Sequence, residues 1–248
     1  YDAVHNQAKA DILELMGLGD DYEVLFIQGG ASMQFDMVAM NFATPEKRGN
    51  YVLSGSFASK ACKEAEILGR GYVAASSKDT NFKHIPTQEE IKLSDDAAYL
   101  HVCYNNTIYG TEIKEDMACP VPLIADMSSD ILSRPVDVSK YTMIYGGAQK
   151  NAGPAGVIFA IIRKDALGKV SRYIPTMLDY RTHIDKESMF NTPPVFSIFV
   201  MNETLKWVKS MGGVEAVHKL NLKKAETIYN EIDRNSLFVG TAAKEDRS

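Results

Sequence analysis

A lysine and an aspartate each stand at the end of an apolar run, and their chemistry sets the first hypothesis. Residues 121–125 (VPLIA) lead into Asp126, and residues 141–149 (YTMIYGGAQ) lead into Lys150, twenty-four positions later. In a parallel α/β sheet the strand ends open onto the ligand crevice, and this separation allows one crossover between neighbouring strands. A lysine amine can bind an aldehyde covalently while an aspartate pairs with a protonated ring nitrogen. The two residues therefore predict a site for pyridoxal phosphate (PLP).

A glycine-rich turn provides a candidate site for the phosphate of such a cofactor. Residues 28–33 (QGGASM) follow an apolar run and precede a helical pattern. The first N–H groups of a helix are unpaired and its dipole adds positive charge, so Gly30, Ala31 and Ser32 are candidate phosphate ligands. The structural alternative is that Gly29 and Gly30 form a tight turn and Ser32 caps the helix.

Other polar and aromatic residues stand at similar positions, each with a structural alternative. Phe57 opens a helix after a strand, where its ring could stack on a flat cofactor or belong to the core. Thr107 ends a strand and could face the crevice, or its neighbours could form a local turn. Asn191 and Thr192 precede two prolines and alone indicate only a turn. His101 lies in an apolar strand and is predicted to be a hydrogen-bonded core residue. The histidines form no pair at i,i+4, so no metal site is predicted.

Strand patterns alternate with helical patterns along the chain, which favours a mostly parallel, doubly wound sheet. Helices are expected over 3–16, 32–43, 57–68 and 196–235, the last with a break at Gly212-Gly213. Strands are expected over 23–28, 50–54, 72–76, 97–103 and 156–162, and before Asp126 and Lys150. The run 156–162 is fully apolar, as in a strand buried on both faces. A further strand is expected to begin at Phe238.

Composition narrows the class of protein. The 248 residues are 45% hydrophobic and carry a formal charge of -5, which suits one large α/β domain or two small ones and disfavours nucleic-acid binding. The three cysteines lack metal-binding spacing and are interpreted as reduced thiols of a cytoplasmic protein. No apolar run approaches the roughly 20 residues of a membrane span. Because the chain begins at Tyr1, the sequence leaves open a leader ahead of it.

Five segments together resemble one enzyme family over essentially the whole chain. They are FIQGGASMQF at 26–35, VLSGSFASKA at 52–61, YNNTIYGTEI at 104–113, ADMSSDILSRPVDVSKYTMIYGGAQKNAGPAGV at 125–157, and MFNTPPVFSIF at 189–199. As a set they are similar to the phosphoserine aminotransferases, which are fold-type I PLP enzymes of the class-V aminotransferase family. The resemblance implies transamination between O-phospho-L-serine with 2-oxoglutarate and 3-phosphohydroxypyruvate with L-glutamate, in serine biosynthesis. The substrates are small molecules, and neither nucleic acid nor membrane is expected as a partner.

The resemblance also implies a role for each candidate residue. Lys150 binds the cofactor aldehyde and moves the substrate proton, Asp126 pairs with the ring nitrogen, and Thr107 approaches the phenolic oxygen. Phosphate contacts are implied for Gly30, Ala31, Ser32 and Gln149, and ring stacking for Phe57. Asn191 and Thr192 are implied to reach the cofactor of a neighbouring subunit, so the active unit is expected to be a homodimer.

The resemblance also implies an architecture, and this chain differs from the family in two respects. It implies a three-layer α/β/α large domain over residues 1–235, with a mostly parallel seven-stranded sheet, and the start of a truncated C-terminal small domain over 236–248. The family usually has tryptophan where this chain has Phe57. Two His-Arg pairs that grip the substrate in the family lie outside this chain. The chain is therefore expected to be a large-domain fragment that is inactive alone.

Two alternatives stay open at this point. Another fold-type I enzyme, such as a serine–glyoxylate-type aminotransferase or a cysteine desulfurase, would share Asp126 and Lys150. A desulfurase needs a cysteine in a mobile loop, and none of the three cysteines has that setting. A non-catalytic chain that keeps the fold is a different class. The absent substrate arginines favour it, whereas the intact lysine and aspartate disfavour it.

Overall fold

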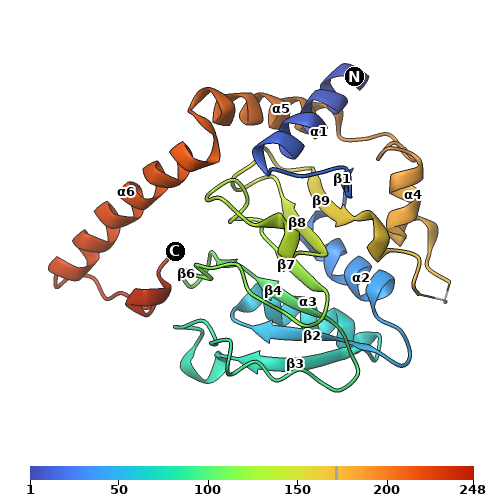
Figure 1. Ribbon diagram of the computed structural model, residues 1–248. Helices are drawn as coiled ribbons and strands as arrows, with labels where there is room; N and C mark the ends of the chain where they lie inside the picture. The colour runs from blue at the N-terminus through green and yellow to red at the C-terminus, as the bar shows by residue number, and fades with distance from the viewer. Residues whose placement is uncertain (171–172) are drawn as a thin grey trace.

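A seven-stranded sheet forms the centre of the computed structural model, which describes residues 1–170 and 173–248. The strands are β1 (Tyr22–Ile27), β2 (Arg48–Leu53), β3 (Gly71–Ser76), β4 (Ala97–Cys103), β7 (Leu123–Asp126), β8 (Met143–Gly147) and β9 (Ile158–Arg163). Their spatial order is β1-β9-β8-β7-β4-β2-β3 (Figure 1). Each strand predicted from the sequence before residue 170 is present, with ends shifted by one or two residues in most cases.

The sheet is mostly parallel, as predicted, with one reversed strand. Neighbouring strands from β8 to β3 pair in parallel, whereas β9 pairs antiparallel with both β8 and β1. Six strands therefore direct their carboxyl ends to the same edge. The apolar run that predicted β9 fits either direction, because a strand covered on both faces has no polar side to orient it.

Helices cover both faces of the sheet, which confirms the predicted three layers (Figure 1). They are α1 (Asp2–Leu15), α2 (Gly30–Phe42), α3 (Ser56–Ile67), α4 (Tyr180–Asp185), α5 (Val195–Ser210) and α6 (Gly213–Arg234). Alternate side chains of β1 serve the two cores: Val24 packs in the core with α1 and α5, and Leu25 in the core with α2 and α3. This period-two alternation is what a strand between two helical layers requires.

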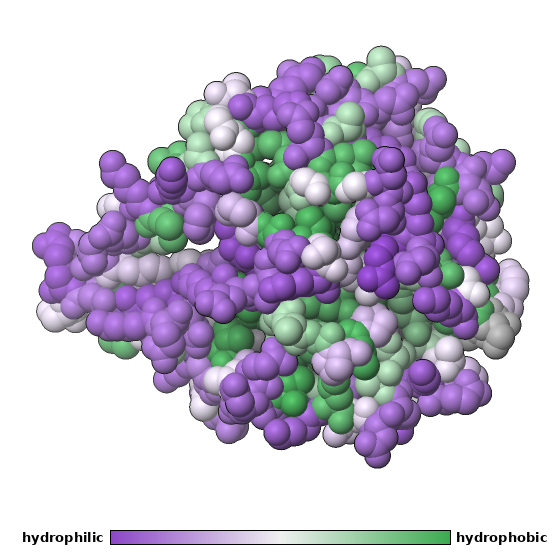
Figure 2. Space-filling model, in the orientation of Figure 1, coloured by the Kyte–Doolittle hydropathy of each residue, from purple (hydrophilic) through white to green (hydrophobic). Residues whose placement is uncertain are grey.

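The chain leaves the sheet through α5 and α6. Gly212 ends α5 with a backbone φ of +99°, a left-handed conformation that favours glycine, and α6 then runs away from the body (Figure 1). Hydrophilic residues cover most of this projecting arm (Figure 2). The strand predicted at Phe238 is wrong: residues 236–243 form neither helix nor strand. Phe238 and Val239, the apolar residues behind this prediction, are exposed and pair with no strand of the described sheets.

Aromatic and imidazole side chains form a buried polar network beneath the α2–α3 layer. The His101 Nε2 and the Tyr145 hydroxyl are 2.8 Å apart, and the hydroxyls of Tyr51 and Tyr99 are 2.6 Å apart. The prediction that His101 is a hydrogen-bonded core residue is confirmed. Burial lowers its pKa to about 3, so the ring is neutral at ordinary pH. None of the described helices combines the length and the apolar character needed to cross a membrane.

Candidate active site

Lys150 lies on the short connection from β8 to β9. Ala148 and the residues beyond Lys150 fold into a tight turn, in which the Gly153 N–H donates to the Ala148 carbonyl over 2.7 Å and the Ala148 N–H donates to the Val157 carbonyl over 3.1 Å. The lysine side chain is exposed. Its ammonium donates a 2.9 Å hydrogen bond to the hydroxyl of Thr107. A fixed backbone therefore presents a free amine at the carboxyl edge of the sheet.

Thr107 reaches this amine from a small hairpin made of β5 (Asn105–Asn106) and β6 (Thr111–Glu112). Its hydroxyl lies 3.0 Å from the hydroxyl of Ser129, which itself donates to the Asn105 carbonyl over 3.3 Å. A carbonyl only accepts, so Ser129 donates to Asn105 and Thr107 donates to Ser129. This direction turns an oxygen lone pair of Thr107 toward Lys150.

The ring of Phe57 covers the other side of the amine. Phe57 stands in the first turn of α3, and the Lys150 ammonium lies 5.0 Å from its ring centroid. The ring is half-buried and also packs against the core under α2 and α3. The interpretation of Phe57 as a core residue is confirmed, and the same ring lies against Lys150, while its stacking on a cofactor stays a prediction.

Asp126 ends β7 one strand away from Lys150 and is buried. Its Oδ1 accepts a 2.6 Å bond from the Ser128 hydroxyl and a 3.0 Å bond from the Ser128 N–H. Burial raises the pKa of the Asp126 carboxyl, while the Ser128 bonds and the charge of Lys150 act in the opposite direction. A buried carboxylate that is costly to ionise is well suited to pair with a cation that enters the site.

The glycine-rich turn forms the start of α2, which begins at Gly30 after Gly29 in the left-handed region, with φ +94°. Ser32 stands inside the first turn, so the alternative in which it caps the helix is wrong. Gly30 and Ser32 are exposed and Ala31 is half-buried. The N–H groups of this turn have no partner within the helix, which makes it a potential anion site at the same sheet edge.

The remaining candidates lie around this edge. Gln149 is exposed and its side chain folds back over Gly147, leaving no room for a Cβ there. Asn191 and Thr192 are also exposed. Both bind Gln28, the first residue of the glycine-rich turn. The Asn191 amide donates to the Gln28 Oε1 over 3.1 Å, and the Gln28 amide donates to the Thr192 carbonyl over 3.0 Å. No described contact joins these two residues to Lys150.

The structure thus joins Lys150, Thr107 and Phe57 directly and places Asp126 on the adjacent strand. Sequence reasoning missed Ser128 and Ser129, which orient Asp126 and Thr107. A serine two residues after a strand-end aspartate often bonds back to that carboxylate, and this signal was present in the string Asp-Met-Ser-Ser. An amine, a buried carboxylate, a ring face and a helix N-terminus at one edge of the sheet can hold a flat, anionic aldehyde cofactor.

The family of the chain follows from comparison with known proteins. Residues 2–248 match the aminotransferase class-V family, and the chain belongs to it. Within it, the chain is 55% identical over 248 residues to the phosphoserine aminotransferase of Bacteroides fragilis, covering all of this chain and 69% of that protein. It is 48% identical over 251 residues to the phosphoserine aminotransferase of Bacillus subtilis, again covering 69% of the relative.

Solved structures agree with this family. The phosphoserine aminotransferase from Bacillus circulans subsp. alkalophilus superposes with a TM-score of 0.96 at 49% identity, over all of this chain and 69% of that one. The PLP-bound phosphoserine aminotransferase from Trichomonas vaginalis gives a TM-score of 0.92 at 37% identity, over all of this chain and 70% of that one. The fold is therefore that of fold-type I aminotransferases.

Proposed function

We propose that this chain carries the cofactor site of a PLP-dependent phosphoserine aminotransferase, which exchanges an amino group between O-phospho-L-serine and 2-oxoglutarate. The observation that carries the proposal is the Lys150 amine, bonded to Thr107 and lying against Phe57. The identity of up to 55% to phosphoserine aminotransferases supports this substrate over that of a serine–glyoxylate-type enzyme. The presence of both the Lys150 amine and the Asp126 carboxylate argues against a non-catalytic chain.

The residues present fit PLP, as the site itself indicates. Asp126 combines a buried carboxyl of raised pKa with an Oδ1 already bonded to Ser128, so a cationic ring nitrogen would stabilise its charge. The first turn of α2, with Gly30, Ala31 and Ser32, would hold the phosphate together with Gln149. Phe57 would stack on the ring with less area than the usual tryptophan, and Thr107 would approach the phenolic oxygen.

Each residue then has a chemical task. PLP, when bound, draws electrons away from the substrate Cα, which makes the Cα proton acidic. The Nζ of Lys150 would first hold the aldehyde and, once free, would take the proton from the substrate Cα and deliver it to the former aldehyde carbon of the cofactor. A free lysine has a pKa of about 10.4, so a nearby positive charge is needed to make the amine a base. Asp126 would keep the ring nitrogen protonated throughout.

The reactive amine can be tested with a matched control. Lys60 also lies against Phe57, with its ammonium 5.4 Å from the ring centroid, so it is the competing amine. We expect borohydride to fix PLP to Lys150 in the unaltered chain and in Lys60→Ala, and to fix none in Lys150→Ala, as read by mass spectrometry of tryptic peptides. An adduct that survives Lys150→Ala or vanishes in Lys60→Ala would refute the assignment of the lysine.

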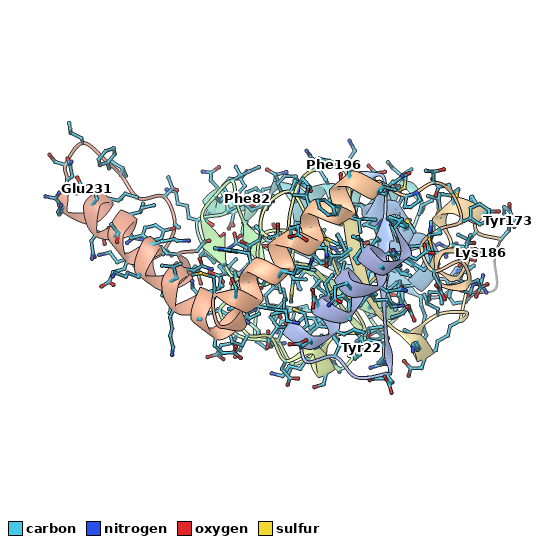
Figure 3. The ribbon with its side chains drawn as sticks, turned by 90° about the horizontal axis from the view of Figure 1, so that it is seen from above. Tyr22, Phe82, Tyr173, Lys186, Phe196 and Glu231 are labelled. Atoms are coloured by element: carbon cyan, nitrogen blue, oxygen red, sulfur yellow. The ribbon has the colours of Figure 1, made fainter. Side chains whose placement is uncertain are left out.

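We further propose that the active unit is a homodimer in which Asn191 and Thr192 reach the neighbouring cofactor phosphate. Both are exposed, and exposed apolar residues flank them, among them Phe190 and Phe196. Phe196 lies at the start of α5, at the margin of the body (Figure 3). Light scattering gives the mass in solution, and a monomer that binds PLP fully would contradict the proposal.

We also propose the domain limits and the location of the protein. Residues 1–235 would form the PLP-binding domain and 236–248 the start of a smaller unit, which is supported by the end of α6 at Arg234 and the irregular chain after it. Limited proteolysis within 236–243 would test this boundary. A cytoplasmic location is supported by three free cysteines, and cell fractionation would test it.

A further inference from the structure

A buried arginine lies behind the site, among three carboxylates. The side chain of Arg134 is 8% exposed. Its Nη1 lies 3.1 Å from Asp116 Oδ1, its Nη2 3.2 Å from Asp130 Oδ2, and its Nε 3.9 Å from Glu112 Oε1. These four residues are called the Arg134 cluster below. An arginine this deep is rare unless paired, and here it meets three partners at once.

The carboxylates of the Arg134 cluster come from two stretches of chain: Glu112 and Asp116 lie in the first, and Asp130 lies in the second, four residues before Arg134. Glu112 is in β6, so its 3.9 Å ion pair with Nε connects the guanidinium to the hairpin that presents Thr107. Asp130 follows directly on Ser128 and Ser129, in the 127–134 segment. The Asp116 carboxylate is itself held in place, because it also accepts 2.7 Å bonds from the Tyr141 hydroxyl and the Asp137 N–H.

The two segments joined by Arg134 are the ones that orient the site. Ser128 bonds Asp126, and Ser129 bonds Thr107. The guanidinium therefore supports Asp126 and Thr107 indirectly, through the segments that carry Ser128 and Ser129. It also lies over the ring of Tyr104, 5.4 Å from the centroid, which restricts its movement further.

The charges of the cluster make the arginine hard to replace. Three carboxylates face one guanidinium, and Lys114 adds a second cation only at the rim, 2.9 Å from Glu112. Burial raises the pKa of Asp130 to about 7, even though Arg134 acts to lower it. Without the guanidinium the carboxylates would repel one another, and the hairpin would lose its electrostatic tie to the 127–134 segment.

We propose that Arg134 is a positioning residue for the cofactor, because it ties the hairpin that carries Thr107 to the segment that carries Ser128 and Ser129. This inference rests on the proposed function of the site. Arg134 touches no cofactor contact itself and acts through the two serines. Its loss should therefore change how tightly PLP is held and how its ring is protonated, and not only how stable the fold is.

The experiment compares Arg134→Met and Arg134→Lys with Arg163→Met as control. Arg163 pairs with Asp165 at the end of the reversed strand β9, at the opposite sheet edge. Three quantities are measured in the protein with its full natural chain: PLP affinity, the pH midpoint of the visible band of bound PLP, and the midpoint of thermal unfolding. We expect about tenfold to a hundredfold weaker PLP binding and a shifted band midpoint in Arg134→Met, partial recovery in Arg134→Lys, and no change of either in Arg163→Met.

The outcomes separate this inference from the proposed function. If the unaltered protein fails to bind PLP through Lys150, the proposed function is wrong. If it binds PLP and Arg134→Met lowers only the unfolding midpoint, Arg134 is merely structural and the inference is overturned. Should Arg134→Met not fold, Glu112→Gln takes its place, since it removes the charge on the hairpin and leaves the bond to Asp116. An unchanged affinity and band midpoint in that variant would equally overturn the inference.

Discussion

Removing the hydroxyl of Ser128 should change the pH dependence of PLP binding. As the pH is lowered, the affinity for PLP should fall at a higher pH in Ser128→Ala than in the unaltered protein. The hydroxyl donates a 2.6 Å bond to Asp126 Oδ1 and accepts a 3.1 Å bond from the Gly147 N–H. A hydrogen bond to a charged group is worth about 1.5–3 kcal/mol, and one pKa unit corresponds to about 1.36 kcal/mol. In Ser128→Ala the pKa of Asp126, already raised by burial, should therefore rise by a further ~1–2 units.

The chain contains its own control for this bond. Ser139 binds Asp137 in the same arrangement, with its hydroxyl 2.6 Å and its N–H 3.2 Å from Oδ1, but on the surface. There the serine bonds prevail and the pKa of Asp137 is lowered, whereas burial prevails at Asp126. Ser139→Ala removes an equivalent bond without touching the site, so PLP binding should not change.

The assay is a titration of the cofactor-free protein with PLP from about pH 5 to about pH 9, followed by visible absorbance. Only the charged form of Asp126 pairs with a ring cation, so affinity should fall as the pH drops through the pKa of this carboxyl. The midpoint of that loss should lie ~1–2 pH units higher in Ser128→Ala. A midpoint identical to that of the unaltered protein would refute the reasoning, because the hydroxyl would then contribute nothing to the charge of Asp126.

Three further predictions test the site and the core beneath it. In the protein with its full natural chain, Asp126→Asn should still attach PLP to Lys150 when PLP is in excess, although with the lower affinity expected of an uncharged side chain, and should slow transamination by roughly a hundredfold or more. Near-normal turnover in a steady-state assay would remove Asp126 from its role. Gly29→Ala should lower the free energy of unfolding by about 1–2 kcal/mol in urea titrations, because φ is +94° and the new Cβ would lie 2.5 Å from Met33 Sδ; an equally stable variant would contradict this. His101 should show no NMR titration near the ordinary histidine pKa, since burial lowers its pKa to about 3. Because the unfolded chain takes up the proton more readily, the neutral His101 ring contributes stability that is complete above about pH 6.5 and declines as the pH falls toward 3.

The sequence alone predicted the parts of the site that depend on local pattern. An apolar run followed by a charged residue identified both Asp126 and Lys150, because strand ends in a parallel sheet meet at one edge. It also identified the start of α2, although the capping role of Ser32 was left open. These signals extend over only a few residues, and the structure places Asp126, Lys150 and the start of α2 at the same edge of the sheet, while their roles toward a cofactor stay predictions.

Contacts between distant segments could not be predicted in this way. The bond from Lys150 to Thr107 spans forty-three positions, and no periodicity in either segment encodes it. Nothing in the sequence around Arg134 indicates that its side chain is buried beside Glu112 and Asp116, about twenty residues earlier. The strand expected at Phe238 failed for the same reason, since a strand exists only where a neighbour accepts its hydrogen bonds, and a local apolar pair carries no information about that neighbour.

The reversed strand β9 has a consequence for the order in which the molecule assembles. The residues from the Thr107 hairpin through Asp126 to Lys150 lie within positions 105–150, and β9 returns directly beside β8, so the contacts among them close shorter loops than the pairing of β1 with β9 does. The glycine-rich turn instead follows β1, whose residues 22–27 pair with residues 158–163 across most of the chain. Since short loops close at lower entropic cost, the amine and carboxylate half of the site can form early in folding. The glycine-rich turn is then expected to join the site last, when the amino-terminal strand pairs with β9.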